Sequence, residues 1–225
     1  MEYKISGENL QLVTVQINPG EKIYAEAGAM VYMSGNMQME AKMRGGLMKG
    51  IGRKFAGETA FLTEFVTAGG TGMVSFGGPA PGKIKAIDVM PGKDFIIQKD
   101  AFLVAENNVE ISIVFQKRLG AAFFGGEGFI LEKLSGTGKS FIHACGDFVE
   151  FDLAENQLLK VDTGMVVGWD STVSYDIERL KGIKTMFFGG EGLFLATLKG
   201  PGKVILQSMS LNTLAATIMR GLQRR

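Results

Sequence analysis

The side chains best suited to chemistry in this sequence are one histidine and one cysteine, which stand two residues apart. His143 and Cys145 are each the single residue of their type in the chain. Residues two apart on a strand point to the same face, whereas a catalytic Cys–His pair normally meets across the fold. Transition-metal sites usually draw several histidine and cysteine ligands. We therefore predict no enzyme activity, no catalytic residue, no cofactor and no His/Cys metal site.

A glycine-rich stretch in the second half of the chain resembles the end of a phosphate-binding loop but lacks the full pattern. Residues 136–140 read G-T-G-K-S, and Lys133 stands where that pattern needs its first glycine. The dinucleotide-binding pattern G-x-G-x-x-G also fails, because Leu131 occupies the last glycine position after Gly126. We interpret these glycines as tight corners between strands.

Three carboxylates hold equivalent places in a recurring motif. The motif F-F-G-G-E-G occurs at 123–128 and 187–192, and a worn copy, F-A-G-E-T, occupies 55–59. Its glutamates are Glu58, Glu127 and Glu191. If the fold brings them together, three carboxylates can bind a cation or raise one another's pKa. Alternatively, each glutamate caps its own turn or pairs with a nearby lysine.

A basic segment at 42–54 is the candidate functional surface of the first third of the chain. It has no acidic residue and interleaves methionine, leucine and isoleucine with its cations. Such a segment is suited to anionic lipid, a phosphorylated ligand or an acidic partner; the alternative is a strand and turn with a solvated basic face. The candidate contact residues are Lys42, Arg44, Lys49, Arg53 and Lys54.

The recurring motif predicts an all-β domain built from three copies of one unit. Each copy combines short apolar runs with glycine corners, which is typical of an antiparallel β-sandwich or barrel. The A-G-A-M-V segment ending at Val31 also recurs, with Val104 and Val167 aligned to that valine. We place the units at about 10–85, 86–150 and 151–210 of a single domain, 1–225, and expect pseudo-threefold packing.

The last residues of the chain differ from the rest. From Ser210 to Arg225, leucine and isoleucine recur at spacings of three and four, which predicts an amphipathic helix over 211–225. Ser210 or Asn212 is the expected N-cap, and arginines gather at the C-terminal end, where the helix dipole favours cations. The helix docks either on the β core, on a partner subunit or on a membrane surface.

Composition limits the class of protein. At 225 residues and 46% hydrophobic, the chain can bury a large core, yet no apolar run reaches the roughly 18–20 residues of a spanning helix. The start of the sequence has no secretion or import leader, and a single cysteine fits a reducing compartment. The net charge of +1 does not favour nucleic-acid binding. We expect a cytoplasmic protein that is also able to lie at the periphery of the inner membrane.

Several stretches together resemble a known family. They are A-G-A-M-V-Y-M at 27–33, G-G-L-M-K-G-I-G-R-K-F-A-G-E at 45–58, the two F-F-G-G-E-G motifs and W-D at 169–170. The chain resembles the altered-inheritance-of-mitochondria family of mitochondrial biogenesis, in its bacterial and archaeal branch of unknown function. This resemblance implies a β fold grouped with the tryptophan-RNA-binding-attenuator-like (TRAP-like) proteins, often oligomeric, and it supplies no catalytic residues.

These observations favour a non-enzymatic scaffold or interaction protein that acts through self-assembly, at a membrane surface or with a protein partner. We expect a homo-oligomer, either a trimer or a larger multiple, because open sheet edges can pair between subunits. The alternative is a small-ligand binding protein that uses a cleft between the β units.

Overall fold

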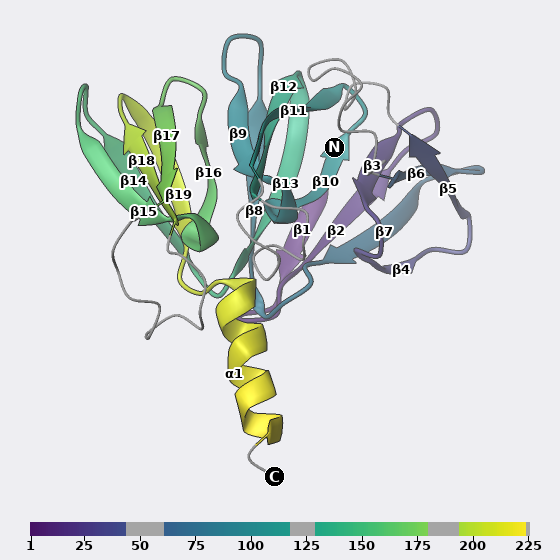
Figure 1. The fold of residues 1–225 in the computed structure, drawn as a ribbon. Helices are drawn as coiled ribbons and strands as arrows, with labels where there is room; N and C mark the ends of the chain where they lie inside the picture. The colour runs from purple at the N-terminus through teal and green to yellow at the C-terminus, as the bar shows by residue number, and fades with distance from the viewer. Residues whose placement is uncertain (44–60, 118–128, 180–193, 224–225) are drawn as a thin grey trace.

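The computed structural model describes residues 1–43, 61–117, 129–179 and 194–223. Within these ranges the chain is built mainly of β-strands and ends in one α-helix, as predicted (Figure 1). The first strand, β1 (Tyr3–Ser6), precedes three successive sets of six strands.

The strands of the three sets follow one another along the chain. The first set comprises β2 (Leu12–Ile17), β3 (Ile23–Glu26), β4 (Met30–Met33), β5 (Met37–Met43), β6 (Phe61–Thr67) and β7 (Gly72–Gly77). The second comprises β8 (Gly82–Val89), β9 (Phe95–Gln98), β10 (Phe102–Glu106), β11 (Val109–Lys117), β12 (Phe129–Gly136) and β13 (Gly138–Cys145). The third comprises β14 (Phe148–Leu153), β15 (Leu158–Asp162), β16 (Val166–Asp170), β17 (Ser174–Arg179), β18 (Phe194–Lys199) and β19 (Gly202–Gln207). Short 3₁₀ turns, η3 (Lys99–Ala101) and η5 (Thr163–Met165), precede β10 and β16.

The same antiparallel pairing order occurs in each set. The first, sixth and third strands of a set lie side by side, and so do its second, fifth and fourth strands. Two further pairings join the sets: β3 pairs with β10, and β9 pairs with β16. The result is four sheets, in the orders β1-β2-β7-β4, β5-β6-β3-β10-β13-β8, β11-β12-β9-β16-β19-β14 and β15-β18-β17.

Hydrophobic side chains fill the space between consecutive sheets. One cluster, which includes Val15, Val74 and Phe141, lies between the first two sheets. A second, which includes Phe102 and Leu134, lies between the two six-stranded sheets, and a third surrounds Trp169 and joins the last two sheets. The central strands of the six-stranded sheets are therefore buried on both faces, which explains why β9 and β10 are apolar at consecutive positions instead of alternating.

The two outermost faces of this stack carry polar side chains beside exposed apolar ones, among them Met73 on the first sheet and Leu158 on the last. On the first sheet, the Thr14 hydroxyl lies 3.1 Å from the Tyr32 hydroxyl and 3.2 Å from that of Ser75. On the last sheet, the Lys160 ammonium pairs with the Glu178 carboxylate at 3.5 Å.

Local details recur at corresponding positions. Register shifts fall between Met30 and Tyr32 in β4, Phe102 and Val104 in β10, and Val166 and Gly168 in β16. The residues skipped are Val31, Leu103 and Val167, so the sequence alignment that matched Val104 with Val31 was one residue out of register.

The sets as the strands define them run over 12–77, 82–145 and 148–207. Both internal boundaries lie a few residues before the predicted ones at 85/86 and 150/151. Because β8 begins at Gly82 and pairs with β13, its first residues belong to the second set. The glycine corners lie at 136–138 and 200–202, in the β12–β13 and β18–β19 hairpins, and three of these glycines have positive φ.

The join between β9 and β16 leaves no room for a side chain at Gly168. A Cβ there would lie 2.4 Å from the Ile96 carbonyl oxygen and 2.7 Å from the Phe95 ring. We predict that Gly168→Ala lowers the free energy of unfolding by about 1–3 kcal/mol, because overpacking forces the paired strands apart. Urea unfolding measures this effect.

Gly35→Ala is the matched control, because a Cβ at Gly35 meets no atom within 4 Å. If the Gly168→Ala variant is as stable as the Gly35→Ala variant, the β9–β16 pairing accommodates the added methyl group and the prediction is wrong.

Candidate interaction site

The terminal helix, α1 (Leu211–Gln223), begins where the sequence predicts and is capped by Ser210. The Ser210 hydroxyl accepts a hydrogen bond from the Thr213 backbone N–H at 3.1 Å, which satisfies one of the free donors of the first turn. Of the two expected caps, Ser210 is the one used. Figure 1 shows α1 extending away from the sheets instead of lying across them.

One side of α1 presents an uncovered apolar stripe. Leu211 is 42% exposed, Ile218 55%, Met219 60% and Leu222 69%. These residues follow the spacing of one helix face. After its first turn, therefore, the helix is not docked on the described β core of its own chain.

A helix of this length needs a partner. Isolated helices shorter than about 12–15 residues are only marginally stable in water, and most helical stability in proteins comes from packing an apolar face. α1 has 13 residues. Its exposed stripe is therefore a candidate contact surface.

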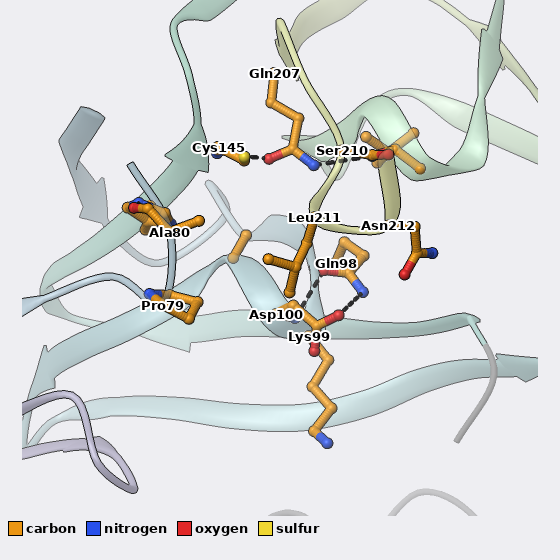
Figure 2. A pocket seen from close by; sticks show the side chains of 14 residues that line it. Pro79, Ala80, Gln98, Lys99, Asp100, Cys145, Gln207, Ser210, Leu211 and Asn212 are labelled. Atoms are coloured by element: carbon orange, nitrogen blue, oxygen red, sulfur yellow. Dashed lines mark hydrogen bonds between the residues drawn. The ribbon is translucent and has the colours of Figure 1, made fainter. Parts of the chain in front are cut away.

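A cavity of about 270 Å³ lies at the base of α1, between η3, β13 and β19 (Figure 2). Leu211 extends toward Gln98 and Asp100 across this space. Its apolar walls come partly from Pro79, Ala80 and Val166. A second cavity, of about 310 Å³, shares Leu211 and η3 as walls. Both volumes are near the lower limit for small-ligand sites.

Two glutamines beside the cavity hold its walls in place through hydrogen bonds. The Gln98 amide accepts from the Asp100 backbone N–H at 2.7 Å and donates to the Asp100 carboxylate at 3.0 Å. The Gln207 amide accepts from the Cys145 backbone N–H and donates to the Gly164 carbonyl, both at 2.8 Å. Gln207 thereby ties β13 of the second set to η5 of the third.

His143 and Cys145 both line this cavity, which confirms that they lie on one side of their strand. The His143 Nε2 lies 3.0 Å from the Ala80 carbonyl oxygen, and burial lowers the pKa of the imidazole. Burial also raises the pKa of the Cys145 thiol. Both shifts favour the uncharged forms of these side chains, which lie on the wall of the cavity.

The structure describes one of the five basic residues predicted as a contact. The Lys42 ammonium lies 2.6 Å from the Glu64 carboxylate and 3.4 Å from that of Glu40. The hydrogen bond to Glu64 raises the pKa of Lys42 and lowers that of Glu64. Lys42 thus pairs within its own sheet. The other four basic residues and the three repeat-equivalent glutamates lie outside the described residues: Arg44, Lys49, Arg53, Lys54, Glu58, Glu127 and Glu191.

Sequence reasoning missed Glu132, a carboxyl group buried within β12. Its side chain is 5% exposed. Burial, with the negative charges of Glu26 and Asp100, raises the pKa of Glu132 to about 8, and Lys99 opposes this shift. The available signal was a single acidic residue in the apolar run F-I-L-E-K-L at 129–134.

The described residues contain no group of three or more histidine, cysteine, aspartate or glutamate side chains arranged to hold a metal ion. Across the same part of the chain, no helix has the length and hydrophobicity required to span a bilayer.

The fold and the site define a protein of stacked antiparallel sheets whose terminal helix presents an exposed apolar stripe. Residues 3–209 match the family described as mitochondrial biogenesis AIM24. The chain belongs to this family, as its motifs suggested.

Two Streptococcus pyogenes proteins are similar to this chain. An uncharacterized protein of serotype M6 is 29% identical over 217 residues, covering 93% of this chain and 86% of the relative. A second S. pyogenes protein, solved by X-ray crystallography, matches with a TM-score of 0.77 and 25% identity, covering 97% of this chain and 98% of the other.

The buried carboxyl group predicts a specific pH dependence. The pKa of Glu132 is about 8 in the folded state and 4.5 in its ordinary state. Between these values the folded state holds a proton that the unfolded state has released, so Glu132 lowers the free energy of unfolding as pH rises from 4.5 to 8. The slope reaches at most about 1.4 kcal/mol per pH unit. Glu132→Gln is expected to remove this part of the slope.

Urea unfolding at pH 5, 6, 7 and 8 makes the comparison, with Glu110→Gln, at an exposed position on β11, as the control. Parallel stability curves for wild type and Glu132→Gln would contradict the prediction.

Proposed function

We propose that this protein is a non-enzymatic interaction protein that attaches to an anionic membrane surface through α1 and acts there as a scaffold. The observation that carries the proposal is the exposed stripe of Ile218, Met219 and Leu222 on a helix that extends away from the sheets. Inserting such a stripe among lipid tails removes apolar surface from water, worth about 1.5–3 kcal/mol for each large side chain fully buried.

The charges of the terminal segment favour an anionic surface. Residues 211–225 contain no acidic residue, and their three cations are Arg220, Arg224 and Arg225. Basic residues beside an anionic bilayer each contribute about 1 kcal/mol. An apolar stripe combined with a cationic polar face is typical of helices that lie in the membrane interface. The basic segment at 42–54 supplies additional cations in the sequence.

A coiled coil with a second copy of α1 fits these residues less well. Coiled coils normally repeat their apolar positions over at least three or four heptads, with charges of both signs beside the seam. The 13 residues of α1 make fewer than two heptads, and they include no acidic residue to pair with the arginines. Binding to a lipid surface requires neither a heptad repeat nor charges of both signs.

We also propose that the three strand sets are copies of one TRAP-like unit, related by a pseudo-threefold arrangement. Their common pairing order and register shift support this proposal. So does a recurring contact: Glu106 accepts a hydrogen bond from the Lys139 N–H, Asp170 from the Lys203 N–H, and Ser34 from the Met73 N–H. A rigid body of repeated units suits a scaffold.

Binding of a small ligand is a second candidate function, favoured by the cavity between the second and third sets at the base of α1. A molecule held there would be retained through gentle purification. Native mass spectrometry of the intact protein would then show a discrete added mass that disappears on denaturation. Protein without added mass would count against this candidate.

Flotation with liposomes tests the membrane proposal. We predict that the full chain floats with vesicles containing phosphatidylglycerol at low salt, and less with phosphatidylcholine vesicles or at high salt, because screening weakens the attraction of the arginines. Replacing two stripe residues, Ile218→Ser with Leu222→Ser, is expected to abolish flotation.

The matched control carries Ala216→Ser with Thr217→Ser, two exposed substitutions elsewhere on α1. It is expected to float like wild type. In a third variant, Lys49, Arg53 and Lys54 are replaced by Ser. Its flotation measures how much of the lipid binding depends on the basic segment. If wild type never floats, or the stripe variant floats as well as the control, the proposal is wrong.

A further inference from the structure

The chain makes the same strand join twice within itself. At each join, the second strand of one set pairs antiparallel with the third strand of the next: β3 with β10, and β9 with β16. The registers correspond position by position. Ala25 faces Val104 as Ile97 faces Gly168, and Tyr24 faces Ala105 as Ile96 faces Trp169.

The two strand types that form these joins also occur at the two ends of the stack, where each lies at the edge of its sheet. β4 is the third strand of the first set and lies at the edge of its sheet. β15 is the second strand of the third set and also lies at a sheet edge. Among the residues that the structure describes, each of these two strands therefore pairs on one side only. One chain thus carries both halves of a third join, at opposite ends.

β4 has the composition of a paired strand. Its sequence, M-V-Y-M, lacks the charged residues and prolines with which proteins usually protect a free edge. Val31 is 54% exposed and Tyr32 45% exposed, and on β15 Leu158 is 60% exposed. Both free edges therefore present apolar side chains to water beside unpaired backbone groups.

The register of the third join follows from the two internal ones. The register shifts make Tyr32 of β4 equivalent to Val104 and Gly168, and Met33 equivalent to Ala105 and Trp169. The pairings of β3, β9 and β15 with the fifth strands of their sets make Val161 equivalent to Ala25 and Ile97, and Lys160 equivalent to Tyr24 and Ile96.

We propose that β4 of one copy of this chain pairs antiparallel with β15 of a second copy, with Tyr32 opposite Val161 and Met33 opposite Lys160. The contact is head-to-tail, so repeating it produces a ring if the rotation closes and a filament if it does not. The outer sheet faces carry more polar side chains than the faces at the internal joins, although Met73 and Leu158 are exposed there. The contact is centred on the strand edges and depends on protein concentration.

This proposal uses residues distant from α1 in sequence and does not rest on the membrane proposal. Either proposal can be wrong while the other holds, because the edge pairing is measured in solution without lipid. Liposome flotation of α1 variants leaves the edge pairing untouched.

Disulfide trapping tests the register. All proteins carry Cys145→Ala to remove the buried native thiol. One chain carries Met33→Cys and a second chain of different mass carries Lys160→Cys. Directly opposed residues on antiparallel strands have Cα atoms about 4.5–5.5 Å apart, within the range of a disulfide. Mild oxidation of the mixture is expected to give the mixed dimer.

Met33→Cys mixed with Leu158→Cys is the out-of-register control, and it is expected to give at least tenfold less mixed dimer. Equal yields from the two mixtures, or no mixed dimer from either, overturn the proposal.

Light scattering after size-exclusion chromatography, over a range of protein concentrations, tests the edge itself. The expected result is a mass that rises with concentration for wild type and stays at one chain for Val31→Lys, a charge on the free edge. Val149→Lys, at a residue 41% exposed on the edge strand β14, is the matched control and should assemble like wild type. A wild-type protein that stays at one chain, or assembly unchanged by Val31→Lys, refutes the proposal.

Discussion

The structure depends on strand pairing between successive sets. The β3–β10 and β9–β16 joins turn half-sheets of three strands into sheets of six, and each of these larger sheets then has hydrophobic clusters on both faces. Without these joins, each set would be a small sandwich with exposed apolar faces. Gly168 shows how closely the paired backbones approach, because even a methyl group there would collide with Ile96. The close approach of these paired backbones limits the size of the side chain that position 168 can hold.

The same constraint explains why the ends of the chain differ from its middle. One position that is apolar inside the stack is polar on the first outer face: Ser75 of the first set occupies the place that Phe141 holds in the second and Ile205 in the third. The edge strands and the terminal helix keep apolar side chains exposed. These exposed elements are the places where the molecule can contact something outside itself.

The buried polar groups near η3 have a different role. The Gln98 amide donates to and accepts from Asp100 of η3, and the Gln207 amide joins β13 to η5. Glu132 introduces an ionisable group into the interior, with its pKa raised to about 8 by burial and by neighbouring carboxylates. Burial likewise keeps His143 neutral and Cys145 protonated. The cavity at the base of α1 is thus defined by shape and hydrogen bonding more than by charge.

The sequence by itself determined the local structure and the family. Alternating apolar residues, glycine corners and the capped amphipathic helix follow from short-range preferences of the backbone and side chains. The F-F-G-G-E-G motifs helped to indicate the family, although the glutamates themselves lie outside the described residues. Only the tertiary structure decided that Val31 corresponds to Leu103, that Lys42 pairs with Glu64, that Glu132 is buried, and that α1 extends free of the sheets. Each of these depends on contacts between residues distant in sequence, and local spacing carries no information about such contacts.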